Sequence, residues 1–186
     1  KMRSDKSLRE LLQMVALMPM AIPGIVLGLA YIFFFNAKGN PLNFFYATMA
    51  ILVVNTIVHF YTVSHLSAIT AIKKLDDEFE SVSLSLKIPT YKMFFRVTLP
   101  VCLPTVFDIF IYLFCNAMTT VSGVIFLYSY DTTLASVSAI HLDEQGDVAG
   151  AAAMAMLIVY ISFVVRGLHT IISTLLLKRT QAWRKI

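Results

Sequence analysis

The segment from Lys73 to Pro100 reads KKLDDEFESVSLSLKIPTYKMFFRVTLP and lies between two long apolar runs. The run before it, Asn43–Ile72, contains no Asp, Glu, Lys or Arg, and the run after it, Leu99–Tyr130, contains only Asp108. A bilayer core about 30 Å thick needs roughly 20 helical residues, so each run is long enough to cross it. A charged segment between two such runs is typical of a polytopic membrane protein.

Two further apolar runs flank this central part, Leu11–Asn36 without a charge and Val148–Leu177 with only Arg166. Of the 186 residues, 58% are hydrophobic and 14% are charged, against about 45–50% and about 25% in soluble domains. This balance argues against a water-soluble enzyme and against a disordered chain. We therefore predict an all-α polytopic membrane protein with about four transmembrane helices, the first of them bent at Pro19 and Pro23.

The basic residues predict the orientation of these helices. Of the 15 Lys and Arg residues, 13 lie in three segments, 1–9, 73–96 and 178–185, and the connections 37–42 and 131–147 together hold one. Because cytoplasmic loops are enriched in Lys and Arg, both ends of the chain are expected in the cytoplasm. The net charge of +4 is thus a topology signal, and no clustered basic groove suggests nucleic acid.

The cytoplasmic segment 73–98 is expected to contain two short amphipathic helices. In the first, Leu75, Phe79, Val82 and Leu86 recur at helical spacing and form one apolar stripe. Four acidic residues between positions 76 and 80 suit the positive end of a helix dipole.

The second short helix is expected to follow a break at Ile88-Pro89, with Thr90 as its N-cap and with its end at Pro100. Two uses of the helix pair are open, floating on the lipid surface or docking on a cytoplasmic partner. Acidic residues beside basic ones make the loop a poor ligand for anionic lipids, which favours docking.

The loop resembles the coupling loop of binding-protein-dependent ABC importer permeases (the MetI-like transmembrane domain). That family's loop reads Glu-Ala-Ala, three residues, Gly, nine residues, an aliphatic residue, one residue, Leu-Pro. The stretch Val97–Pro100 matches its end, as do Phe94 and Arg96. Counting back, Lys87 stands at the Gly position and Glu80 lies one residue before the Glu position. The turn glycine is therefore absent, and the Ile-Pro pair that follows is expected to supply the break.

Two further stretches indicate which branch of these permeases the chain resembles. The stretch Leu17–Gly28 resembles the iron(III) and phosphonate branch of these permeases, and Tyr91–Pro104 looks most like the 2-aminoethylphosphonate permeases. The resemblance implies a permease subunit for 2-aminoethylphosphonate or another phosphonate. The alternative it leaves open is iron(III) or another small anion. Since four spans are fewer than the five or six usual for one permease half, residues 1–186 are expected to be one transmembrane domain of a longer permease.

The resemblance also implies a mechanism, in which the loop seats in a groove of an ATPase and transmits its closure to the membrane helices. The residues implied for this contact are Leu75, Phe79, Glu80, Val82, Leu86, Lys87, Tyr91, Phe94, Arg96, Leu99 and Pro100. The implied partners are a cytoplasmic ABC ATPase dimer, an extracytoplasmic substrate-binding protein, a second permease half and the lipid bilayer. The implied location is the bacterial inner membrane.

Polar residues inside the apolar runs are candidates for the translocation path. A carboxylate at a helix centre costs about 2.5–3.5 kcal/mol on insertion scales, so Asp108 should face protein or water. Helical spacing places further polar residues on its face and on one face of the second run. The candidates are Asn55, His59, Asp108, Tyr112, Asn116 and Thr119. The alternative is that these residues make interhelical hydrogen bonds worth about 0.6 kcal/mol each.

The remaining polar residues and motifs suggest structural roles. We expect Arg166 to reach the inner interface, with His169 further out. No HExxH, GxSxG or Walker A motif is present, and Cys102 and Cys115 lack metal-ligand spacing. We therefore expect no cofactor and no enzymatic activity in this chain. A secondary transporter or channel fragment is the rival from another functional class, although a single intramembrane Asp supports it poorly.

Overall fold

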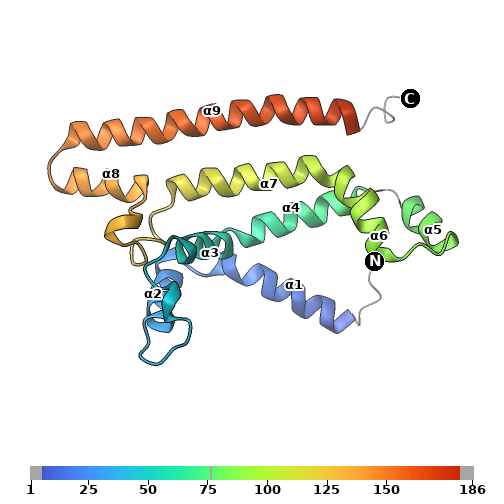
Figure 1. The fold of residues 1–186 in the computed structure, drawn as a ribbon, viewed down its shortest axis with the longest axis horizontal. Coiled ribbons are helices and arrows are strands. Elements are labelled where there is room, and N and C mark those ends of the chain that lie inside the picture. The colour runs from blue at the N-terminus through green and yellow to red at the C-terminus, as the bar shows by residue number, and fades with distance from the viewer. Residues whose placement is uncertain (1–5, 76, 181–186) are drawn as a thin grey trace. The chain divides into compact units, whose positions relative to one another are not determined.

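The structure, a computed structural model, describes the backbone of residues 6–75 and 77–180. Within these residues every regular element is a helix (Figure 1), as predicted. The longer helices are α1 (Lys6–Ala21), α2 (Gly24–Phe35), α3 (Met49–His59), α4 (Tyr61–Lys73), α5 (Asp77–Ser85), α7 (Leu99–Thr119), α8 (Ala135–Glu144) and α9 (Val148–Thr180). The short elements are η1 (Asn43–Phe45), α6 (Thr90–Met93), the π-helical turn η2 (Phe94–Thr98) and η3 (Tyr130–Thr132).

Two helical stretches among the described residues are long and apolar enough to cross a membrane unbroken. They are Thr90–Thr119, with 30 residues, and Val148–Leu175, with 28 residues. Two bent pairs pass the same criteria when each is taken together, α1 with α2 at 104° and α3 with α4 at 56°. The structure therefore has two helices that could each be a span, or four spans if each bent pair is counted as one.

The first apolar run is divided at Ile22-Pro23, so the expectation of one helix across it is wrong. Pro19 remains inside α1, whereas Pro23 stands at the N-cap of α2 with φ −57° and ψ 139°. Proline has no N–H to donate to α1 and disfavours helical backbone in the residue before it. The predicted bend is thus confirmed, and the break lies at the second proline.

The second and third runs also differ from the single helices expected there. In the second, α3 ends at His59 and α4 starts at Tyr61, although no proline or glycine stands at this break. In the third, α7 ends at Thr119, and irregular backbone with turns at residues 122–127 and the short helix η3 leads from there to α8. Those turns carry the buried Val124 and Leu127, so this irregular segment is part of the core.

The chain divides into two compact units, one formed by Lys1–Val63 with Leu113–Ser162 and the other by Ser64–Tyr112 with Phe163–Ile186. The first unit holds the main apolar core. Its fully buried residues come from α3, α8 and the irregular segment after α7, and they are Ile51, Leu52, Val124, Leu127 and Val137. The second unit holds the loop between α4 and α7 and the last part of α9.

Candidate functional site

The turn between the two loop helices is centred on Lys87, which adopts a left-handed backbone with φ +53°. The N–H of Ile88 donates to the carbonyl of Ser83 at 2.9 Å, and the N–H of Lys87 donates to that of Leu84 at 3.1 Å. These two bonds form a Schellman motif, the arrangement that closes many helices and usually has glycine at this position. The break therefore lies at the position of the family's glycine, and the Ile-Pro pair only follows it.

The second loop helix begins and ends differently from the expectation. Pro89 is its N-cap, with φ −64° and ψ 139°, so Thr90 is the first helical residue and not the cap. The helix does not stop at Pro100, because α6, η2 and α7 run on without interruption to Thr119. Within η2 the N–H of Leu99 donates to the carbonyl of Phe94, five residues back. Such wide turns accompany irregularities like the missing N–H of Pro100.

Two residues of the predicted apolar stripe, Phe79 and Val82, lie on α5, and Val82 is 54% exposed. A groove of about 610 Å³ lies within the loop, and Phe79 and Val82 line it. Its other lining residues come from both arms of the loop, namely Glu78, Ser83, Ile88, Lys92, Met93, Arg96 and Val97. Ser83 is buried, and its hydroxyl donates to the carbonyl of Ile88 at 3.3 Å. The groove is thus lined by apolar side chains together with charged ones of both signs.

Several predicted contact residues of the loop remain open to a partner. Leu86, Tyr91 and Phe94 are 66%, 61% and 42% exposed. Leu75 precedes α5, and Leu99 and Pro100 lie in the first turn of α7. The side chain of Glu80 lies outside the described residues.

The side chains of Asn55 and Thr62 make hydrogen bonds to backbone carbonyls that are distant in sequence but lie in the same compact unit. The side-chain amide of Asn55 is buried and donates to the carbonyl of Gly123 at 2.9 Å. The hydroxyl of Thr62 is also buried and donates to the carbonyl of Ala16 at 2.9 Å. The Thr62 bond joins α4 to α1, whereas the Asn55 bond joins α3 to the turn that follows α7. His59 lies beside them, as the last residue of α3.

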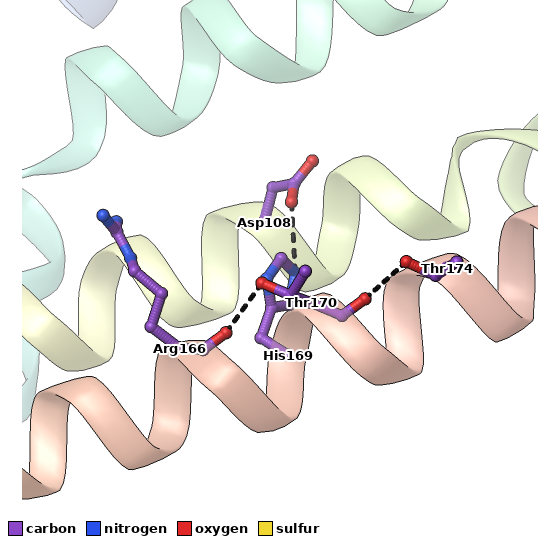
Figure 2. A network of polar contacts seen from close by, with 5 residues as sticks. All are labelled: Asp108, Arg166, His169, Thr170 and Thr174. Carbon is purple, nitrogen blue, oxygen red and sulfur yellow. Dashed lines mark hydrogen bonds and ion pairs between the residues drawn. The ribbon is translucent and has the colours of Figure 1, made fainter.

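Asp108 on α7 pairs with His169 on α9, as Figure 2 shows. The Nε2 atom of His169 lies 3.1 Å from Oδ1 of Asp108, and the two side chains are 14% and 59% exposed. The sequence prediction placed His169 only relative to the membrane interface and did not link these two residues. Asp108 is 9 residues from the start of α7 and His169 is 11 residues from the end of α9, so a similar distance from these helix ends is the sequence signal that could have linked them.

The other polar residues on α7 are half-buried or exposed. Tyr112 and Asn116 are half-buried, and Thr119 is exposed, with its hydroxyl donating to the carbonyl of Cys115 at 3.1 Å. On α9, Thr170 likewise bonds the carbonyl of Arg166 at 3.0 Å (Figure 2). Hydroxyls that bond back along their own helix leave no unmet donor in an apolar setting. Among the described residues, no three His, Cys, Asp or Glu side chains gather as metal ligands would.

Residues 2–178 match the family described as binding-protein-dependent transport system inner membrane component. The chain is also similar to the ferric transport system permease protein FbpB of Actinobacillus pleuropneumoniae, with 28% identity over 145 residues. It is 25% identical over 142 residues to the Fe(3+)-transport system permease protein FbpB 2 of Haemophilus influenzae. These matches cover 78% and 76% of this chain but only 21% and 28% of the relatives.

A solved structure shares the fold. It is the crystal structure of a bacterial ABC transporter involved in the import of the acidic polysaccharide alginate. The comparison gives a TM-score of 0.74 at 16% identity and covers 93% of this chain and 68% of that chain. The fold class and the family predicted from the loop are thereby confirmed: the chain belongs to the binding-protein-dependent transport system inner membrane components, the MetI-like ABC permease family.

Proposed function

We propose that this chain is part of the membrane permease of an ATP-driven importer of ferric iron. The observation that carries the proposal is the description of its relatives as ferric and Fe(3+) transport permeases. The comparisons do not support the phosphonate substrate that the resemblance placed first, and they favour the iron(III) alternative. The family's members are membrane components of transporters, and ATP hydrolysis would take place in a separate subunit.

The loop 73–98 would couple this permease to its ATPase. Leu86, Tyr91 and Phe94 offer exposed apolar surface of the kind that a protein groove can bury. The continuous helical stretch Thr90–Thr119 would serve as a stiff connector from the loop into the membrane. Glu78, Lys92 and Arg96 around the groove would orient the partner, since complementary charges fix register.

The rest of the importer would be supplied by further permease segments and by separate protein subunits. The chain spans 21% and 28% of its ferric relatives, so further helices and a second permease half would complete the membrane portion. An extracytoplasmic substrate-binding protein would deliver the substrate. Both ends of this segment would lie on the cytoplasmic side of the inner membrane, as the distribution of basic residues favours.

The polar face of α7 would line part of the translocation path. Asp108 is 59% exposed despite its place in an apolar helix, and its pairing with His169 lowers the cost of holding a carboxylate there. Tyr112, Asn116 and Thr119 continue the same face by helical spacing. For Asn55, by contrast, the hydrogen bond to Gly123 supports a packing role.

Uptake by the reconstituted transporter tests this function. The whole permease, with its ATPase and substrate-binding protein, is placed in liposomes and supplied with radioactive iron(III) or with radioactive 2-aminoethylphosphonate. We expect iron uptake that requires ATP and stops when the ATPase subunit is left out. Uptake of the phosphonate without iron uptake would contradict the substrate. Iron uptake without the ATPase would instead support a secondary transporter.

A further inference from the structure

The groove within the loop is a cavity that the exposed residues proposed to meet the ATPase do not line. Its volume of about 610 Å³ lies within the range of about 300–1,000 Å³ found for sites that hold small molecules. All of its lining residues belong to one compact unit, whereas Leu86, Tyr91 and Phe94 are not among them. The groove is therefore a candidate binding site that is separate from the apolar contact with the ATPase.

The lining of the groove combines apolar side chains with charges of both signs. Its apolar members are Phe79, Val82, Ile88, Met93 and Val97. Glu78 contributes a carboxylate from α5, and Lys92 and Arg96, four residues apart on the second arm of the loop, contribute two cations. Helical residues four apart are neighbours on one face, so the two cations share one side of the groove. A complementary ligand carries an apolar part, an anion and a cationic hydrogen-bond donor.

The length of the helical stretch that follows relates the groove to the lipid headgroups. The stretch Thr90–Thr119 has 30 residues and is thus about 45 Å long at 1.5 Å per residue. The hydrocarbon core of a bilayer is about 30 Å thick, and the whole bilayer with its headgroups is about 40–45 Å thick. A helix of this length that crosses the core therefore extends into the headgroup layers. Its first two turns carry Lys92 and Arg96, which favours the cytoplasmic layer.

We propose that the groove binds a zwitterionic phospholipid with a primary ammonium headgroup, phosphatidylethanolamine. Its phosphate accepts hydrogen bonds from Lys92 and Arg96, and its ammonium donates to Glu78. Its acyl chain covers the apolar lining, of which Val82 and Ile88 are 54% and 40% exposed. The mixed charges that make the loop a poor ligand for anionic lipids are complementary to a headgroup of no net charge. Carboxylate, ammonium and guanidinium groups each make several hydrogen bonds, so the headgroup and the ATPase can share these charges.

Lipid binding to the whole permease, purified in detergent, tests the site without iron and without the ATPase. Titrations followed by native mass spectrometry compare phosphatidylethanolamine with phosphatidylcholine, whose quaternary ammonium has the same charge but donates no hydrogen bond. We expect phosphatidylethanolamine to bind about tenfold more tightly. Glu78→Gln should abolish this preference, because the amide keeps the shape of the side chain but loses its charge. Arg96→Gln should weaken the binding of both lipids by about tenfold, since both carry the phosphate.

Two further variants control for charge and for folding. Lys74→Gln removes an exposed cation of the same loop that does not line the groove, and it should leave the affinity for both lipids unchanged. Val82→Trp, at an exposed lining position, should fill part of the groove and weaken both lipids by about tenfold. This variant tests the site even if the Glu78→Gln protein does not fold.

Three results would refute the lipid site. They are equal affinities of the wild-type permease for the two lipids, a preference that survives Glu78→Gln, and tighter binding of anionic phosphatidylglycerol than of phosphatidylethanolamine. Co-purification of the ATPase with the same variants adds a fourth. If Glu78→Gln and Val82→Trp lose the ATPase while their lipid binding is unchanged, the groove belongs to the ATPase and the proposal is wrong.

Discussion

At the scale of single residues, Lys87 stands where the family's loop has glycine, and its backbone has the left-handed conformation that glycine usually supplies at the end of a helix. Its φ of +53° and the two bonds of the Schellman motif place it where the family's loop has glycine. An L-residue in this left-handed region costs roughly 1–2 kcal/mol. The sequence comparison could show that glycine was missing there, but only the backbone shows that the turn stays at the same residue.

Lys87→Gly is therefore expected to stabilise the loop by about 1 kcal/mol, because glycine adopts this conformation without a Cβ penalty. Hydrogen exchange at the amide of Ile88, which donates into the motif, should slow by about fivefold. Lys92→Gly is the matched control, since Lys92 lies in α6. At that helical position glycine should destabilise the loop by about 0.5–1 kcal/mol and should make hydrogen exchange of its amides faster. Faster exchange at Ile88 in Lys87→Gly would contradict this explanation of the turn.

At the scale of elements, the helices could be predicted better than their interruptions. The bend at Pro23 follows from a residue that lacks an N–H, and the sequence shows it. The breaks after His59 and Thr119 occur without proline or glycine at the break. They coincide instead with long-range contacts, such as that of Asn55 with Gly123 across 68 positions. Tertiary contacts of this kind leave no periodic signal in a single apolar run.

The glycines of α2 provide a prediction about helix packing. A Cβ on Gly28 would lie 2.8 Å from the backbone oxygen of Gly123, which cannot swing aside as a side chain could. Gly28→Ala should destabilise the protein by about 1–3 kcal/mol. Gly167→Ala is the control, because nothing lies within 4 Å of its added methyl and alanine is the better helix former. Thermal unfolding in detergent should show a lower unfolding temperature for Gly28→Ala and a higher one for Gly167→Ala. Equal shifts in the two variants would contradict the close approach of Gly28 to Gly123.

At the scale of the whole molecule, composition and charge predicted the class of protein, and the loop predicted its family. The pairing of Asp108 with His169 was missed because the two residues lie 61 positions apart on different helices. Of the predicted apolar stripe, only Phe79 and Val82 lie on α5, where they line a groove formed by the loop itself, and Leu75 and Leu86 lie before and after that helix. The substrate could not be read from the residues, since similar permeases carry different cargo, and the ferric relatives changed the order of the candidates.

Binding of the ATPase by the loop 73–98 is the central claim for the assembled transporter, and co-purification of the ATPase with permease variants tests it most directly. Leu86→Asp places a charge on exposed apolar surface of the loop, and Leu42→Asp, on the connection predicted to face outward, is the control. We expect at least about tenfold less ATPase to co-purify with the Leu86→Asp variant than with the wild-type permease, because burying an unpaired carboxylate is costly. Leu42→Asp should retain it. Equal ATPase recovery and ATP-dependent uptake in both variants would contradict the claim.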